Sequence, residues 1–273
     1  MKFSQELDFV ALDIETTGLS EHKDEIIEIA AVKIRNGEIV EVFDSFVRPK
    51  GKVPKFIQFL THISLEQLQG APDIKEVLLK LKDFVGKSPI VGHNVGFDLG
   101  FINHNMVLIG DFPLLNVRWD TVELARIYLP FVSDHKLGTL VRHFDIPLDN
   151  AHRADADAIA TGKLLLSLAD HICDNYSMVT NSRILSLCRM AQMESNDFMQ
   201  RVLDHQKATA ISAPPVSKVR SPYYNVIDNS LPAAKNPAIE SVFSEDGLFS
   251  REFQNFEYRY GQMQMARAVD DAF

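Results

Sequence analysis

Two carboxylates, two residues apart, are the first feature of this chain that could do chemistry. Asp13 and Glu15 stand in VALDIETTGL, at the end of an apolar run, LDFVAL, that is typical of a buried strand. Side chains two apart on a strand leave the same face, so both acids project together. Close carboxylates repel unless a divalent cation lies between them, and hard oxygen ligands favour Mg²⁺ or Mn²⁺. The pair predicts a metal site, with an exposed strand end before a turn as the alternative.

Two later blocks supply a third acid, a histidine and a fourth acid. Asp98 follows HNVGF at the start of an expected helix, where the alternative role is to complement the helix dipole. His152 and Asp157 stand in HRADADA, before and inside the start of another expected helix. A histidine that titrates near neutral pH can accept a proton from water, although a capping or surface role is the alternative. Four carboxylates and one imidazole are what a two-metal phosphodiesterase needs.

The elements that must position these residues follow from the hydrophobic pattern. Strands are predicted over residues 7–14, 25–35, 38–47 and 89–92. The pair Asn36-Gly37 between the second and third of these is typical of a hairpin turn. Helices are predicted over residues 73–86, 97–108, 120–128, 136–144 and 153–171. This alternation predicts an α/β domain with a mixed sheet.

The motifs divide the chain into a catalytic part and a remainder. All of the chemistry-bearing blocks fall within residues 1–172, which we expect to form one domain. The expected remainder is a helical extension over 173–210, a proline-rich linker over 211–248 and an aromatic, helical segment over 249–273.

Composition narrows the function classes. The net charge of −9, from 28 basic and 37 acidic residues, excludes a general nucleic-acid coat, so contact with nucleic acid must be local. The two cysteines and the charged N-terminus MKFSQELD predict a cytoplasmic protein without a signal peptide, and no apolar run predicts a membrane partner.

The blocks together resemble the DnaQ-like 3′→5′ exonucleases of the DEDDh type, which have a ribonuclease H-like fold. The resemblance covers roughly residues 7–172 and rests on DIETTGL, EIIEIAAVKI, FVRP, FLTHIS, HNVGFD, DTVELAR and HRADADA. His62 departs from it, because the family often has Gly in that segment. The resemblance implies a mixed five-stranded sheet flanked by helices.

The same resemblance implies the role of each residue. Two Mg²⁺ or Mn²⁺ ions would be held by Asp13, Glu15, Asp98 and Asp157, and His152 would be the general base. The substrate would be the 3′ end of single-stranded DNA or RNA, with DNA favoured, released as nucleoside 5′-monophosphates. The residues expected to bind it are Thr16, Thr17, Leu19, His93, Asn94 and Phe97. A structural hydrogen bond is the alternative for His93, a turn for Asn94 and a core position for Phe97. A basic loop could contact phosphates or only be solvated; it contains Arg48, Lys50, Lys52 and Lys55.

The last segment carries a second resemblance. FEYRYGQMQMARAV is similar to the entry segment of DinG-type superfamily 2 helicases, with Arg259 and Gln262 in the places of an Arg and a Gln that precede the phosphate-binding loop. This implies the exonuclease part of a DinG-type exonuclease–helicase whose helicase domain would be the partner. An amphipathic helix is the alternative for the segment. For the whole chain, the alternatives are a proofreading subunit like polymerase III epsilon, an RNA-trimming exonuclease and a non-catalytic single-strand-binding module.

Overall fold

A five-stranded mixed sheet is the centre of the computed structural model, which describes residues 2–148 and 151–212. The sheet order is β3-β2-β1-β4-β5, with β1–β2 and β2–β3 antiparallel and β1–β4 and β4–β5 parallel. The strands are β1 (Phe9–Thr16), β2 (Ile26–Arg35), β3 (Glu38–Phe46), β4 (Ile90–Gly92) and β5 (Arg118–Asp120). The predicted α/β class and mixed sheet are confirmed. The fifth strand lies in a segment for which the pattern predicted none.

Helices cover the sheet and continue beyond it. They are η1 (Phe3–Glu6), α1 (Lys55–Thr61), α2 (Leu65–Gln69), α3 (Ile74–Val85), α4 (Val95–Leu108), α5 (Thr121–Tyr128), α6 (Leu137–His143), α7 (Ala154–Asn175), α8 (Met178–Met190) and α9 (Asn196–Ser212). The short helices α1 and α2 were not predicted. His62 ends α1 in the left-handed conformation (φ 57°) that glycine adopts most easily, which is where the sequence departs from its resemblance.

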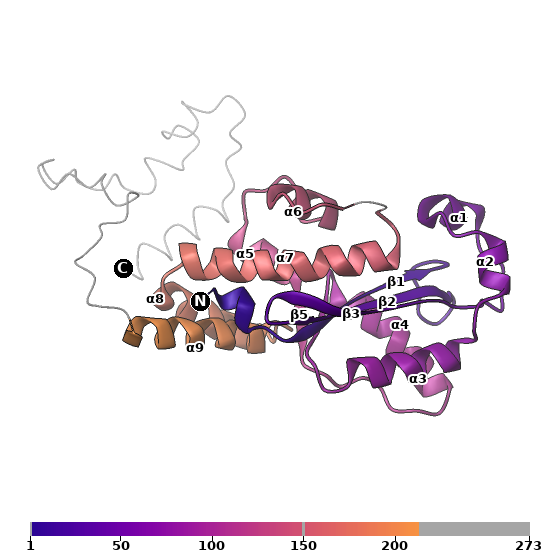
Figure 1. Ribbon diagram of the computed structural model, residues 1–273, viewed down its shortest axis with the longest axis horizontal. Helices are drawn as coiled ribbons and strands as arrows, with labels where there is room; N and C mark the ends of the chain where they lie inside the picture. The colour runs from indigo at the N-terminus through magenta and orange to yellow at the C-terminus, as the bar shows by residue number, and fades with distance from the viewer. Residues whose placement is uncertain (1, 149–150, 213–273) are drawn as a thin grey trace, which may run out of the picture. The chain divides into compact units, whose positions relative to one another are not determined.

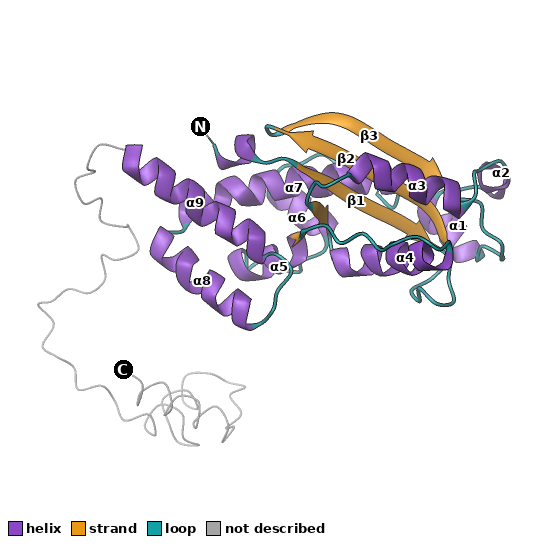
Figure 2. Cartoon of the chain, turned by 90° about the horizontal axis from the view of Figure 1, so that it is seen from below, coloured by secondary structure: helices purple, strands orange, loops and turns teal. Residues whose placement is uncertain are grey.

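Alternation along the strands divides the core into two layers. On β1, Phe9 and Ala11 pack toward α7, whereas Val10 and Leu12 pack toward α3 and α4. Figure 1 shows α7 lying along one face of the sheet, and Figure 2 shows α3 and α4 on the other. A side chain at Gly162 of α7 would meet Ile34 and the Cβ of Ala11, so the glycine lets the helix lie close to the sheet.

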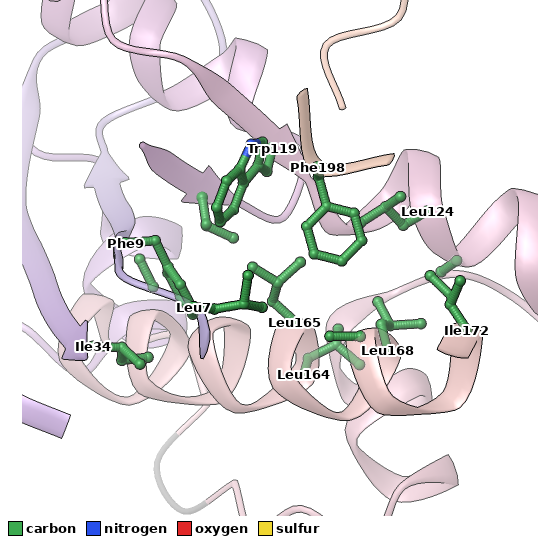
Figure 3. Close-up of a cluster of buried hydrophobic side chains, with 14 of the residues drawn as sticks. Leu7, Phe9, Ile34, Trp119, Leu124, Leu164, Leu165, Leu168, Ile172 and Phe198 are labelled. Carbon is green, nitrogen blue, oxygen red and sulfur yellow. The ribbon is translucent and has the colours of Figure 1, made fainter. Parts of the chain in front are cut away.

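The helices α8 and α9 share the core of the α7 layer. Phe198 of α9 lies against Trp119 of β5, with 5.5 Å between ring centroids, and near Leu124 and the leucines of α7 (Figure 3). Met199 and Val202 are buried in the same cluster. The expected extension over residues 173–210 therefore contributes part of the core that supports β5.

The remaining expectations concern residues outside the described part of the chain. The linker beyond residue 212 and the terminal segment with Arg259 and Gln262 fall there. In the described residues, no helix combines the length and the apolar character needed to cross a bilayer.

Candidate active site

The two acids of β1 lie on the face that α7 covers. Asp13 and Glu15 continue the alternation of Phe9 and Ala11, which pack toward α7. The apolar part of this face ends before the acids, and both side chains are half-buried. As predicted from their spacing, the two acids leave the same side of the strand, at the end where β1 leads into a turn.

Asp98 reaches β1 from the neighbouring element. β4 ends at Gly92, where a Cβ would lie 2.8 Å from the Cα of Val95, so only glycine allows the chain to turn so sharply. Asn94 then adopts the left-handed conformation (φ 74°) and α4 begins. Asp98, in the first turn, accepts a hydrogen bond at Oδ1 from the N–H of Ile14 at 3.2 Å. The amide between the two strand acids thus holds the third acid.

The start of α7 brings the last two residues over the strand acids. His152 precedes the helix with φ 69°, and its N–H donates to Asp157 Oδ2 at 3.1 Å. One possible ligand atom from each of Glu15, His152 and Asp157 lies within 4.8 Å of the others. The first and third sequence blocks therefore meet at the end of β1, and the imidazole is the exposed member of the group.

The acids share an environment that disfavours their charged forms. Burial raises the pKa of Glu15 to about 8, and the neighbouring Asp157 carboxylate adds to the effect. Burial raises the pKa of Asp98 to about 8 as well. The pKa of Asp13 lies well above its ordinary value because of burial and then the charges of Asp98, Asp157 and Glu15. Burial also raises the pKa of Asp157. A cation bound among these carboxyl groups would offset the free-energy cost of ionising them.

The donor set fits a hard divalent cation. Asp157 Oδ1 is buried and has no hydrogen-bond partner among the described residues. A buried carboxylate oxygen without a partner is costly unless an ion or water occupies the position beside it. Carboxylate oxygens are the ligands that Mg²⁺ and Mn²⁺ prefer. The residues that could hold such ions are Asp13, Glu15, Asp98 and Asp157.

Three of the residues expected to bind substrate lie at the end of β1 and in the turn that follows it. Thr16 and Thr17 are buried, and their hydroxyls are used within the turn: Thr16 donates to the Gly18 carbonyl and Thr17 accepts from the Glu25 N–H. Leu19 is 85% exposed beside them. A strand end with an apolar tip is therefore presented to solvent next to the acids.

The other three lie around the start of α4. His93 is held by Thr121, whose hydroxyl oxygen lies 2.9 Å from its Nδ1, and burial lowers the pKa of His93 to about 4. Asn94 forms the left-handed turn described above, with its side chain exposed. Phe97 is half-buried against Phe101, with 5.1 Å between ring centroids. His93 is therefore neutral near pH 7, and Phe97 belongs partly to the core.

Two buried acids near the site were not singled out from sequence. Asp120 accepts at its carboxylate from the N–H groups of Asn94, Val95 and Val122, which ties the start of α4 to the start of α5. Glu28 of β2 is bound by Arg153, the residue after His152. The signal for Glu28 was an acid inside the buried run IIEIAAV, and the signal for Asp120 was the acid that begins DTVELAR.

A cleft leads away from the acids. It has a volume of about 1180 Å³ and is lined by residues of the α4 start, α5, α6 and the segment before α7. His152 and Asp157 lie at one part of its wall, and Arg126, Lys136 and Arg142 line it elsewhere together with acidic side chains. The cleft is large enough to hold more than one nucleotide-sized group.

Curated proteins that are similar in sequence to this chain include PolC-type DNA polymerases. The chain is 42% identical over 181 residues to the PolC-type DNA polymerase III of Latilactobacillus sakei (65% of this chain, 12% of the polymerase). It is 47% identical over 158 residues to that of Clostridium perfringens (58% and 11%). The matched segment thus spans about an eighth of the length of these curated relatives.

Solved structures share the fold. Escherichia coli exonuclease I in complex with a dT13 oligonucleotide superimposes with a TM-score of 0.55 at 20% identity, over 60% of this chain and 41% of that one. Exonuclease X in complex with 5′ overhanging duplex DNA superimposes with a TM-score of 0.50 at 22% identity, over 63% of this chain and 96% of that one. These likenesses confirm the expected ribonuclease H-like fold. The family model RNase_T, described as exonuclease, matches residues 10–165, and the chain therefore belongs to this exonuclease family.

Proposed function

We propose that the chain is a metal-dependent 3′→5′ exonuclease that releases nucleoside 5′-monophosphates from single-stranded DNA. The observation that carries the proposal is the convergence of four acids and one exposed imidazole at the end of β1. Membership of the exonuclease family supports the reaction type. Two bound Mg²⁺ or Mn²⁺ ions would supply charge stabilisation for the attacking and leaving oxygens of an in-line displacement.

Each residue of the site has a role that its position supports. Asp13 and Asp157 would hold one ion, and Asp13, Glu15 and Asp98 the other. His152 would accept the proton of the attacking water, because it is the exposed member of the group and lies beside Glu15 and Asp157. His93 is unsuited to this task, since its pKa of about 4 leaves it a weak base.

Binding of a strand is supported by the surroundings of the acids. Leu19 is free to pack on a terminal base, and Phe97 is only partly buried at the start of α4 and could take part in stacking. The hydroxyls of Thr16 and Thr17 and the N–H of Thr17 are engaged in the turn, so a contact with the terminal ribose would come from their remaining backbone groups. Arg126, Lys136 and Arg142 would meet phosphates along the cleft, and Arg48, Lys50, Lys52 and Lys55 form a further basic loop.

Two settings for this activity are supported by different observations. Similarity to PolC-type polymerases supports a proofreading-type exonuclease and favours DNA over RNA. The terminal segment with Arg259 and Gln262 supports a link to DinG-type helicases through sequence alone. The polymerase-like setting has the longer match, and we propose it as the first to test.

A labelled-strand assay tests the proposed activity. The purified chain is incubated with 5′-labelled single-stranded DNA or RNA in Mg²⁺, Mn²⁺ or EDTA, beside Asp13→Ala and the control Asp155→Ala. Asp155 lies in the same block, HRADADA, but outside the proposed ligand set. We expect a metal-dependent ladder that shortens from the 3′ end, lost in Asp13→Ala and kept in Asp155→Ala. Tight binding without any ladder in either ion would instead identify a single-strand-binding module.

A further inference from the structure

A fifth carboxylate lies beside the site and takes no part in the proposed reaction. Glu28 of β2 pairs directly with Glu15 of β1 in the antiparallel register, and it is 0% exposed. A carboxylate removed from water in this way needs charged or hydrogen-bonding partners. Both of its oxygens have them, so Glu28 is not available as a metal ligand although it is near Asp13, Glu15 and Asp157.

The partners of Glu28 are two consecutive residues at the start of α7, Arg153, which precedes the helix, and Ala154, its first residue. Arg153 donates from Nη2 to Oε1 at 2.7 Å and from Nε to both oxygens at 3.1 and 3.3 Å. The N–H of Ala154, at the first turn of the helix, donates to Oε2 at 3.0 Å. The guanidinium also lies 5.3 Å from the ring centroid of Phe46, the residue that pairs with Glu28 on β3. The start of α7 is therefore attached to the sheet at one point by several contacts.

This attachment sits between the two functional residues of the third block. His152 directly precedes Arg153 and has a positive φ of 69°, a conformation that a non-glycine residue keeps only where its surroundings hold it. On the other side, the His152 N–H is bound to Asp157 Oδ2. The segment from His152 to Asp157 is thus bonded to the sheet through Glu28 and within itself through Asp157.

We propose that Glu28 and Arg153 are positioning residues that set where His152 and Asp157 stand relative to Glu15. Arg153 has a second consequence, because it occupies the oxygens of a carboxylate that would otherwise compete for the cation beside Glu15. The inference rests on the proposed function for the meaning of the site, and its test includes a measurement that does not need turnover.

Three variants separate positioning from general stability. Glu28→Gln keeps the shape but turns an amide N–H₂ toward the guanidinium, and Arg153→Lys keeps the charge but loses the two-point contact. Glu41→Gln is the matched control, because it removes the carboxylate of another ion pair made by β2: Lys33 Nζ of β2 binds Glu41 Oε2 of β3 at 2.6 Å and also lies over a ring, Phe84. All variants are assayed as the full chain, at a temperature where circular dichroism shows them folded.

The first measurement is Mn²⁺ binding by calorimetry, which requires no cleavage. We expect Glu28→Gln and Arg153→Lys to bind Mn²⁺ about 10-fold more weakly, as is typical when the groups that orient ligands are changed. Glu41→Gln should bind as the parent chain does. Equal Mn²⁺ affinity in all four proteins would overturn the inference, whether or not the chain cleaves nucleic acid.

The second measurement is the rate on a single-stranded oligonucleotide. Both site variants should lose about 10–100-fold in kcat per folded chain, with KM within about threefold. If Arg153 acts in part through His152, Arg153→Lys should cost less in a His152→Ala background than in the parent chain. Full additivity of the two losses would overturn the positioning of His152 by Arg153. A parent chain without activity would refute the proposed function, and the Mn²⁺ titration would still decide the positioning role.

Discussion

Asp98 Oδ1 accepts a hydrogen bond from the N–H of Ile14, the residue between Asp13 and Glu15, at 3.2 Å. β4 ends at Gly92, so the edge of β1 beyond it has no neighbouring strand, and the acid of α4 takes the place of a strand carbonyl. One carboxylate oxygen thus fixes α4 to β1. The carboxylate as a whole stays beside the two strand acids, so the same group serves the fold and the site.

The variant Asp98→Asn separates these two tasks. An asparagine oxygen can still accept from Ile14, so the fold should persist, but the charge needed for the cation is gone. We expect a loss of at least about 10²-fold in kcat and much weaker Mn²⁺ binding in calorimetry. The control is Asp170→Asn. Asp170 is an acid near the C-terminal end of α7 that accepts a hydrogen bond from the Ser4 N–H. Parent-like Mn²⁺ affinity in Asp98→Asn would remove Asp98 from the ligand set.

The stability of the metal-free chain should depend on pH in the direction set by the buried acids. Folding raises the pKa of Glu15 and of Asp98 to about 8, against about 4 in an unfolded chain. The native state therefore holds protons that the unfolded state has lost. The contribution of these two groups to the free energy of unfolding is greatest at low pH and is lost as the pH rises from about 4 to about 8.

Thermal denaturation in EDTA at pH 5 and pH 8 checks this direction against the double variant Glu15→Gln, Asp98→Asn. From pH 5 to pH 8, the melting temperature of the parent should fall further than that of the double variant. Mg²⁺ should restore the parent at pH 8 and leave the double variant unchanged, because an ion that binds only the native state stabilises it. An identical pH dependence of the melting temperature in both proteins would show that these two acids do not cause it.

The variant His152→Ala tests the proposed base. We expect kcat to fall about 10²–10⁴-fold, with Mn²⁺ affinity changed little, because the imidazole is exposed and the four acids remain. His143→Ala, an exposed histidine of α6, is the control. Rates near the parent value across pH 6–9 would exclude the base role, and a large loss of Mn²⁺ affinity would make His152 a ligand instead.

Local pattern was sufficient for the parts of the site that are close in sequence. The spacing of two placed Asp13 and Glu15 on one face, and Asn36-Gly37 predicted the hairpin, where both residues have positive φ. The three-residue strand Arg118–Asp120 has charged residues on both sides of Trp119 and lacks the apolar run of the equally short β4, so only its pairing with β4 reveals it. This strand ends at Asp120, whose carboxylate binds the N–H groups of Asn94 and Val95, which are distant in sequence.

Contacts between distant residues could not be read from the sequence. Glu28 and Arg153 are 125 positions apart, and no feature of either local sequence predicts that they pair. His93 was expected to form a structural hydrogen bond to a backbone carbonyl, and the structure places the Thr121 hydroxyl oxygen 2.9 Å from its Nδ1. Such partners depend on how β2, β4 and β5 lie in the sheet, which is a property of the assembled fold.

The variant Asp120→Ala should affect stability and activity together. It removes the acceptor for the N–H groups of Asn94, Val95 and Val122, two of them at the start of the helix that carries Asp98. Leaving buried donors unsatisfied costs about 1–3 kcal/mol. We expect this loss in urea unfolding, with weaker Mn²⁺ binding. Asp73→Ala, which removes the cap of α3, should cost about 1 kcal/mol and leave Mn²⁺ binding unchanged. Equal Mn²⁺ affinity in both variants would limit Asp120 to a capping role.

The last prediction concerns the dependence of the sheet on α9. Phe198 is fully buried, with its ring against Trp119 of β5 and Phe3 near the N-terminus. Truncation of a buried phenylalanine leaves a cavity and costs about 3–5 kcal/mol. Phe198→Ala should therefore lower the free energy of unfolding by that amount. Leu187→Ala, at a leucine of α8 that is 64% exposed, should change it by less than about 0.5 kcal/mol.

Urea unfolding followed by circular dichroism and by Trp119 fluorescence measures both variants. Trp119 is the one tryptophan of the chain, so its signal reports directly on the contact between β5 and α9. Coincident transitions by the two probes are expected, because α9 shares its core with α7 and the sheet. If fluorescence changed at lower urea than circular dichroism, α9 would unfold by itself, and the sheet would not depend on it for stability.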